Sequence, residues 1–342
     1  MSQPVAVIVL AAGQGTRMHS DLPKVVHPLC GLSLVGHALR AARGVRPRHL
    51  VAVVRHQRDI VATEIARVAP ETLVADQDEV PGTGRAVQCG LAALEGVAGR
   101  VEGTLLVTYG DVPLLTSQTL AALVDLHEEG GNAITVLTTR VPDPTGYGRI
   151  IREGGAVTAI VEQRDATPEQ RAITEINAGI YAFDAAFLAE ALDRVGTDND
   201  QGEVYLTDVL AAAAPAGRRA GALELEDVWQ AQGCNDRVQL AELGAELNRR
   251  ICGAHMRAGV TIVDPTSTWI DVDVTIGRDT TIRPGTNLRG VSSLGVWCEI
   301  GPGTTLENAR VGDGSTLPAL WGADVDIPAD TMGTPFSVLG GQ

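Results

Sequence analysis

Seven aliphatic residues recur at a strict interval of six in the last quarter of this 342-residue chain. They are Ile270, Ile276, Ile282, Leu288, Leu294, Ile300 and Leu306. A period of six fits neither an α-helix nor an ordinary strand. It is typical of a parallel β-helix, in which each short strand forms one side of a triangular coil. Residues 270–317 therefore predict just under three coils. The spacing changes after Leu306 and the register is lost beyond Leu317, so residues 319–342 are expected to form an irregular tail.

The first part of the chain alternates two other patterns. Continuous apolar runs, such as residues 5–10 (VAVIVL) and 49–54 (HLVAVV), are typical of strands that are covered on both faces. Segments with helical periodicity separate these runs. The sequence therefore predicts a doubly wound, Rossmann-like α/β domain over residues 1–232. An apolar stripe predicts one long linker helix over 233–258, and the short β-helix is expected over 259–318.

The composition limits the kinds of partner. The net charge is −15, whereas nucleic acids and anionic membranes bind proteins through an excess of positive charge. We therefore expect neither as a partner, although a few local cations suffice to bind one phosphorylated ligand. The five cysteines are scattered without metal-site spacing, which is typical of free thiols in a reducing compartment. Because no apolar stretch approaches membrane-spanning length, the expected location is the cytoplasm.

A glycine-rich turn, AAGQGTR, directly follows the first apolar run. Glycines there let the backbone approach a phosphate or a base edge, although a tight strand-to-helix turn would use the same residues. Arg17 and Lys24 lie close behind and suit a polyphosphate, the alternative being two solvated surface cations. Lys24 is the only lysine beside 26 arginines. We infer that this position needs a compact ammonium group.

Two further segments suggest a nucleotide site. Asp111 follows a glycine at the end of a predicted strand, where it would suit Mg²⁺, which prefers one or two carboxylates together with substrate phosphates. The alternative for Asp111 is a helix N-cap. A second glycine-rich loop, residues 77–87 (QDEVPGTGRAV), begins with Gln77. A neutral amide with nearby backbone N–H groups suits the edge of a nucleobase.

Together these segments resemble the sugar-1-phosphate nucleotidylyltransferases. More closely, they resemble the uridylyltransferase half of the bacterial bifunctional enzymes that make UDP-N-acetylglucosamine. The resemblance runs from residue 5 through the long helix into the predicted β-helix, to about residue 317. It rests on blocks in the family's order: LAAGQGTRM, LPK, GTGRAV, YGDVPL, PTGYGRI, IVEQRDAT, EINAGIYAF, QGEVYLTD and GCNDRVQL. So many blocks in the same order make the resemblance specific. It implies a left-handed β-helix and a cell-wall precursor as product.

The resemblance also implies roles for individual residues. Backbone contacts to the nucleotide would come from Leu10, Ala11, Ala12 and Gly13; contacts to uracil from Gln77, Gly82 and Thr83; contacts near the phosphates and ribose from Tyr109, Gly110 and Asp111; contacts to the N-acetylated sugar from Gly148, Glu162 and Asn177; and Mg²⁺ ligands from Asp111 and Asn235. Arg17, Lys24 and Asp111 would be the catalytic residues. The expected reaction converts UTP and N-acetylglucosamine-1-phosphate to UDP-N-acetylglucosamine and pyrophosphate, and it needs no general base.

The sequence departs from the family pattern in three places. Arg85 stands where the family usually has His, and Cys234 and Asp236 flank Asn235 where Val and Asn are common. The predicted β-helix is also much shorter than the family's, so we expect a short form that lacks acetyltransferase activity. Two other functions stay open: a nucleotidylyltransferase for another sugar-1-phosphate, or a non-catalytic sugar-nucleotide-binding subunit. The family's β-helices pack as trimers, so a homotrimer is expected.

Overall fold

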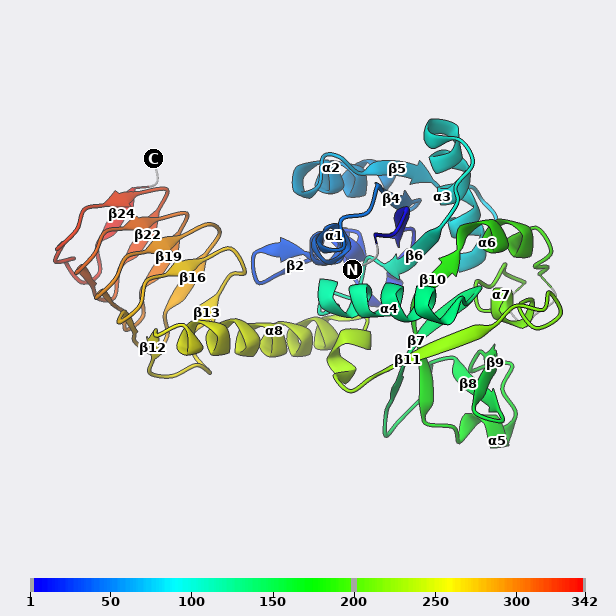
Figure 1. The fold of residues 1–342 in the computed structure, drawn as a ribbon. Helices are drawn as coiled ribbons and strands as arrows, with labels where there is room; N and C mark the ends of the chain where they lie inside the picture. The colour runs from blue at the N-terminus through cyan, green and yellow to red at the C-terminus, as the bar shows by residue number, and fades with distance from the viewer. Residues whose placement is uncertain (1–2, 198–201, 341–342) are drawn as a thin grey trace. The chain divides into compact units, whose positions relative to one another are not determined.

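The computed structural model describes residues 3–197 and 202–340, and it divides into two compact units (Figure 1). Met1–His27 and Ser33–Arg237 form the first unit, while Pro28–Leu32 and Val238–Gln342 form the second. The chain therefore enters the second unit twice, the first time with a short segment near its N-terminus.

The first unit is built on one mixed sheet. Its main strands are β1 (Ala6–Leu10), β4 (His49–Val54), β5 (Leu73–Asp76), β6 (Thr104–Tyr109), β7 (Ile134–Arg140), β10 (Glu175–Asp184) and β11 (Ala220–Leu225). They lie in the order β11-β7-β10-β6-β1-β4-β5. β1 is parallel to β4 and β6, and β4 is parallel to β5, whereas β10 is antiparallel to β6 and β7. The carboxyl ends of β1, β4, β5 and β6 therefore meet at one edge, where open α/β sheets bind their ligands.

Helices cover both faces of this sheet, which explains why its strands are continuously apolar. The helices are α1 (Leu34–Gly44), α2 (Arg58–Val68), α3 (Thr83–Ala98), α4 (Ser117–Gly130), α6 (Ala185–Leu192) and α7 (Asp208–Ala211). Along β1, Ala6, Ile8 and Leu10 pack in one apolar cluster with α3, α6 and α7. The alternate residues Val7 and Val9 pack in a second cluster with α1, α2 and α4. The predicted doubly wound α/β fold is confirmed.

Shorter elements complete the first unit. A hairpin of β8 (Arg149–Glu153) and β9 (Ala156–Val161) extends the sheet through an antiparallel pairing between Arg149 and Ile176 of β10. A single helical turn, α5 (Pro168–Arg171), follows this hairpin and carries a capping box at Thr167. Three 3-10 turns are η1 (Thr16–Met18), η2 (Lys24–Val26) and η3 (Val228–Ala231).

A small hairpin near the N-terminus belongs largely to the second unit. It pairs β2 (Pro28–Leu29) with β3 (Leu32–Ser33). Its two turn residues, Cys30 and Gly31, both have positive φ, as a tight two-residue hairpin requires. Asp271 packs so closely that a Cβ on Gly31 would lie 2.8 Å from the Asp271 Cβ. The N–H of Val272 donates to the Cys30 carbonyl at 3.0 Å.

The rest of the second unit is a long helix followed by a left-handed parallel β-helix. Helix α8 spans Arg237–Arg257. The strands of the first face are β12 (Thr261–Ile262), β15 (Thr281–Ile282), β18 (Glu299–Ile300) and β21 (Thr316–Leu317); those of the second are β13 (Trp269–Ile270), β16 (Asn287–Arg289), β19 (Thr305–Glu307), β22 (Trp321–Ala323) and β24 (Val338–Gly340); those of the third are β14 (Thr275–Ile276), β17 (Ser293–Leu294), β20 (Arg310–Val311) and β23 (Asp326–Ile327). Figure 1 shows these strands stacked as successive coils in the yellow-to-red part of the chain.

The residues of the six-residue repeat form the interior of the β-helix. Six of the seven aliphatic side chains are buried there, and the seventh, Ile276, is half-buried and packs against the same core. Hydroxyl residues that directly precede the strands are also fully buried, and they bond to backbone carbonyls of neighbouring coils. The Thr280 hydroxyl, for example, donates to the Gly295 carbonyl at 2.8 Å. The parallel β-helix predicted from the period of six is confirmed.

The structure differs from the irregular tail expected over residues 319–342. β22 pairs with β19, β23 with β20, and β24 with β22, so the coils continue through the described residues to 340. From β13 to β19 the paired residues are 18 positions apart, as for Trp269 and Asn287. Thr305 and Trp321 are only 16 residues apart, because the corners between strands become shorter. A search for a fixed period of six therefore misses the later strands.

The cysteines and the helices agree with what the sequence predicts for them. None of the five cysteines forms a disulfide, and all five lie in the described part of the chain. Among the described residues, no helix combines the length and the apolar character that crossing a membrane would require.

Candidate active site

A hollow of about 330 Å³ lies at the carboxyl ends of β1, β4, β5 and β6. It is lined by Leu10, Ala11, Ala12, Gly13, Lys24, Val25, Arg55, His56, Gln77, Pro81, Gly82, Thr83, Ala86, Tyr109, Asp111 and Glu203. Ten of these residues are among those that the sequence and the resemblance singled out. Segments that lie far apart in the sequence thus meet at the edge where the fold places a ligand.

Backbone hydrogen bonds hold the glycine-rich turn that follows β1 at one side of this hollow. The N–H of Ala11 donates to the Val53 carbonyl at 2.8 Å, and the N–H of Gly110 donates to the Leu10 carbonyl at 2.9 Å. Gly13 is exposed, and nothing lies within 4 Å of the position that a Cβ would take. Gly15 has φ +65°, and a Cβ there would collide with the stem of Lys24. A glycine at this position therefore allows the turn to pack against the lone lysine.

The Lys24 ammonium donates hydrogen bonds to two side-chain oxygens. Its Nζ is 2.5 Å from Asp111 Oδ2 and 3.3 Å from Asn235 Oδ1. The side chains of Lys24 and Asp111 are 12% and 17% exposed, so solvent screens this ion pair only partly. The N–H of the buried Cys234 donates to the Asp111 carbonyl at 2.9 Å, which brings the adjacent Asn235 to the carboxylate. Three residues from distant parts of the sequence thus meet here, with the Lys24 ammonium held by oxygens of Asp111 and Asn235.

A loop after β5 forms the opposite wall. The Gln77 amide donates to the Val80 and Gly82 carbonyls at 3.0 and 3.3 Å. Gly82 has φ +122°, and a Cβ there would collide with the backbone of Val204. The Thr83 hydroxyl accepts a hydrogen bond from the N–H of Leu206 at 3.2 Å. The loop is therefore held in place by its own hydrogen bonds and by contacts with residues 204–206. The residues through which it lines the hollow, Gln77, Pro81, Gly82 and Thr83, are uncharged.

Gly148, Glu162 and Asn177 form a second cluster that does not line this hollow. The N–H of Asn177 donates to the Gly148 carbonyl at 2.9 Å, and a Cβ on Gly148 would lie 3.3 Å from Glu162 Oε1. The Asn177 side chain is fixed by Tyr181 and by the N–H of Gly179, at 2.6 and 2.9 Å. Burial raises the pKa of the Glu162 carboxyl. These three residues thus form a small polar cluster, contributed by the residue after β9, by β10 and by the loop before β8.

Tyr109 connects the two clusters. Its ring lines the hollow, and a Cβ on Gly179 would lie 2.6 Å from the ring, so only glycine fits beside it. The hydroxyl is hydrogen-bonded to Thr83, and burial raises its pKa well above the usual range. A neutral phenol between the hollow and Glu162 adds no charge to either.

Some residues occupy positions that the sequence did not indicate. Arg17 lies exposed on η1, outside the hollow. Gly110 is buried behind the hollow, next to Leu10. Arg85, which replaces the family's usual His, also lies outside the hollow and binds the Asp78 carboxylate with Nε at 3.0 Å. Its guanidinium holds the pKa of that carboxyl below its usual range.

Three polar lining residues had no role assigned from the sequence, namely Arg55, His56 and Glu203. Arg55 and His56 directly follow β4, so the rule that ligands bind at strand ends could have found them. Glu203 follows no strand and precedes no helix directly, so no local pattern marked it.

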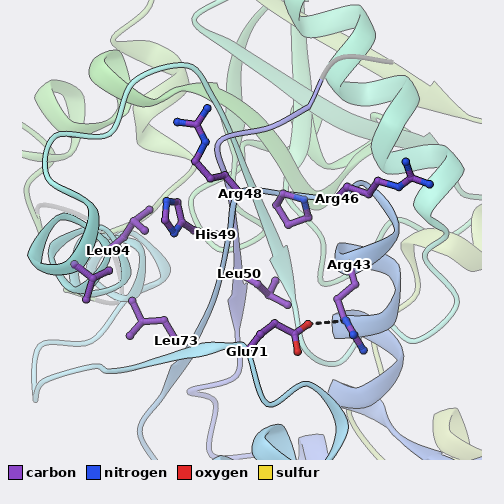
Figure 2. Close-up of a pocket in the computed structure, with 10 residues that line it drawn as sticks. Arg43, Arg46, Arg48, His49, Leu50, Glu71, Leu73 and Leu94 are labelled. Carbon is purple, nitrogen blue, oxygen red and sulfur yellow. Dashed lines mark ion pairs between the residues drawn. The ribbon is translucent and has the colours of Figure 1, made fainter.

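A second hollow of about 250 Å³ lies at the opposite edge of the sheet, where β4 begins (Figure 2). Exposed arginines at its rim surround a leucine floor, and Arg43 is paired with Glu71 at 2.6 Å. None of the residues that the sequence singled out lies there. The candidate active site is therefore the hollow at the carboxyl ends of the strands.

The chain is similar to proteins of known families. The family of MobA-like NTP transferase domains matches residues 7–178. The bifunctional protein GlmU of Kineococcus radiotolerans is 56% identical over 336 residues, which are 98% of this chain and 68% of the relative. The GlmU proteins of Pseudarthrobacter chlorophenolicus and Corynebacterium glutamicum are 55% and 54% identical over 98% of the chain and 68% and 69% of their own lengths.

The comparisons also bear on the expected short form. These relatives are longer than this chain, and the alignments give no support to the expectation that the acetyltransferase half is lacking. The match over the α/β unit and the identity over nearly the whole chain agree with the geometry of the site. This chain belongs to the family of the bifunctional protein GlmU, and its α/β unit is a nucleotidyltransferase domain.

Proposed function

We propose that this protein transfers the uridylyl group of UTP to N-acetylglucosamine-1-phosphate, with pyrophosphate as the second product. The observation that carries the proposal is the convergence of Lys24, Asp111 and Asn235 on one side of a hollow whose other wall is formed by the uncharged residues Gln77, Pro81, Gly82 and Thr83. Charged groups that suit phosphates thus face a loop that suits a nucleobase edge. The polar cluster around Glu162 would hold the sugar.

The residues support a reaction in which positioning and charge neutralisation do most of the work. A phosphate oxygen of the sugar phosphate would attack the α-phosphorus of UTP in line, while the bond from this phosphorus to the pyrophosphate oxygen breaks. The attacking oxygen is already ionised, so no proton has to be removed. Lys24 would neutralise charge on the triphosphate and the leaving group. Arg17 would have to turn toward the hollow from its exposed position on η1 to add to this neutralisation.

The site also suits a magnesium ion. Asp111 and Asn235 direct a carboxylate oxygen and an amide oxygen at one position, where both contact the ammonium of Lys24, and this supports the proposal that the position binds a cation. Mg²⁺ commonly takes one or two protein oxygens and fills its other positions with water and substrate phosphates. When bound, the ion would supply Lewis-acid polarisation of phosphate oxygens. Within the described chain no group of three or more His, Cys, Asp or Glu side chains gathers as a metal site, so substrate oxygens would complete the shell.

The proposal is tested by measuring pyrophosphate release with Mg²⁺, UTP and N-acetylglucosamine-1-phosphate. Glucose-1-phosphate, glucosamine-1-phosphate and the other nucleoside triphosphates run in parallel, with Asp111→Asn as the blank. Turnover confined to UTP and the N-acetylated sugar supports the proposal. Turnover with a different pair assigns the enzyme to another sugar nucleotide, and no turnover with any pair favours a binding subunit.

We further propose that the protein is a cytoplasmic homotrimer that associates through its β-helix. The outward positions of the face formed by β13, β16, β19, β22 and β24 carry Trp269, Trp321 and Val338, which are 43%, 43% and 72% exposed. Two large aromatic side chains on one face support association, because exposed apolar patches mark interaction surfaces. A monomeric mass by light scattering would contradict this proposal.

A further inference from the structure

Arg149 is a solvent-excluded guanidinium without a carboxylate partner. It opens β8, and only 1% of the residue is exposed. No carboxylate lies within ion-pair distance of it among the described residues, and its Nε atom has no hydrogen-bond partner. Excluding a charge from water without pairing it is costly. A residue of this kind is therefore expected to have a function that offsets the cost.

The guanidinium fixes the loop that precedes it. One of its nitrogens, Nη1, donates to the Tyr147 carbonyl, and the other, Nη2, donates to Gln163 Oε1 at 2.6 Å. The same Gln163 oxygen accepts a hydrogen bond from the N–H of Gly146 at 3.3 Å. Nη2 also approaches the Arg171 carbonyl, at 3.5 Å. Arg149 thereby ties residues 146–147 to the end of β9 and to α5.

The segments tied by Arg149 are those that build the polar cluster of the sugar site. Gly148 stands between the tied loop and Arg149 itself, and Glu162 directly precedes Gln163. Ile160 and the Glu162 carboxylate pack against the α-carbon of Gly148, at 3.0 and 3.3 Å from the position of a Cβ. A shift of either segment would therefore change the space between Gly148 and Glu162, where hydroxyl groups of a sugar would have to fit.

Arg149 also affects the charge of this cluster. Asp165 and Asp208 lie near enough to Glu162 to raise the pKa of its carboxyl further than burial alone, while Arg149 lies near enough to lower it. The Thr207 hydroxyl, which donates to Glu162 at 3.5 Å, acts in the same direction as Arg149. The Glu162 carboxylate therefore has two other carboxylates near it, and the guanidinium of Arg149 partly offsets their negative charge.

We infer that Arg149 is a positioning residue for the sugar-phosphate substrate, which acts by fixing Gly148 and Glu162 relative to each other. This inference rests on the proposed function. Arg149 does not touch the hollow that would hold the nucleotide. Its effect is therefore confined to the affinity for the sugar phosphate and does not extend to UTP.

The test compares Arg149→Met, Arg149→Lys and Gln163→Leu with the unchanged enzyme in steady-state kinetics. Arg149→Met should raise the KM for the sugar phosphate about 10- to 100-fold, the range expected for charge-assisted hydrogen bonds, and leave the KM for UTP within about twofold. Arg149→Lys restores the charge without the planar fork and should recover only part of the loss. The matched control is Arg164→Met, which removes an exposed arginine from the same segment and should leave both KM values unchanged.

Gln163→Leu keeps the test informative if Arg149→Met does not fold. Gln163 is only half-buried, and its loss removes the acceptor that joins Gly146 to Arg149. A folded variant whose two KM values stay unchanged, or rise together, would overturn the inference. If the unchanged enzyme itself shows no turnover with any sugar phosphate, the proposed function has failed instead. Turnover of the unchanged enzyme thus distinguishes a failure of the inference about Arg149 from a failure of the proposed function.

Discussion

The ammonium of Lys24 occupies the position that would hold a magnesium ion, so it should compete with that ion. Its Nζ is 2.5 Å from Asp111 Oδ2, and both side chains are largely buried. A charge-assisted hydrogen bond of this kind contributes about 1.5–3 kcal/mol, and the ion must displace it before binding. Since 1.4 kcal/mol corresponds to a tenfold change in a dissociation constant, Lys24→Met should bind Mg²⁺ roughly 10- to 100-fold more tightly without nucleotide.

The measurement is a calorimetric titration of the nucleotide-free protein with Mg²⁺, followed by an assay of pyrophosphate release. The same variant should lose at least about 100-fold in kcat, because the charge that faces the triphosphate is gone. Arg17→Met is the matched control. It also removes one positive charge, but from an exposed position, and should leave the affinity for the ion unchanged. An unchanged or weaker affinity in Lys24→Met would refute the reasoning.

Three further predictions concern the sugar site, the nucleotide loop and the β-helix. Burial raises the folded-state pKa of Glu162, so the ionised carboxylate destabilises the fold at neutral pH, and this penalty disappears below the unfolded-state pKa of about 4.3. Glu162→Gln should therefore raise the Tm at pH 7 but not at pH 4. The same variant should bind the sugar phosphate more weakly at pH 7. A difference in Tm that is the same at both pH values would contradict this prediction. Arg85 bonds the exposed Asp78 outside the hollow, so Arg85→His should change the KM for UTP by less than about threefold in steady-state assays. Trp321→Arg should shift the mass measured by light scattering from trimer to monomer, because it places a charge in the proposed apolar contact; Arg310→Ala, on another face, should not.

The fold could be predicted where one side-chain periodicity persists over many residues. Continuous apolar runs predicted the sheet because α-helices bury both faces of its strands. The period of six predicted the β-helix because each repeat contributes one inward residue. The hairpin over residues 28–33 was missed, since two-residue strands are too short to show a period, and its Cys30–Gly31 turn lacks the usual Asn-Gly or Asp-Gly signal. The later strands were missed because the coils become shorter.

The site could be predicted only where a local sequence pattern marks its residues. Strand ends and glycine positions indicated Gly13 and Asp111, whereas Asn235 came only from the resemblance. The distances that bring Asn235 to Lys24 depend on a backbone hydrogen bond between Cys234 and Asp111, which no local pattern encodes. Arg149 could not be singled out, because a charged residue in a strand usually faces solvent.

Because of the β2–β3 hairpin, the second unit combines a segment that is synthesised early with one that is synthesised late. Residues 28–32 emerge from the ribosome early, yet the groups that they pack against, such as Asp271 beside Gly31, follow about 240 residues later. At roughly 5–20 residues per second this delay lasts on the order of 10 to 50 s. During that time Leu29 and Leu32 lack their final burial, so they are a candidate binding site for a chaperone on the nascent chain. A cut at α8 would leave the same hairpin on the N-terminal fragment, so the C-terminal fragment would lack residues 28–32 of its own unit.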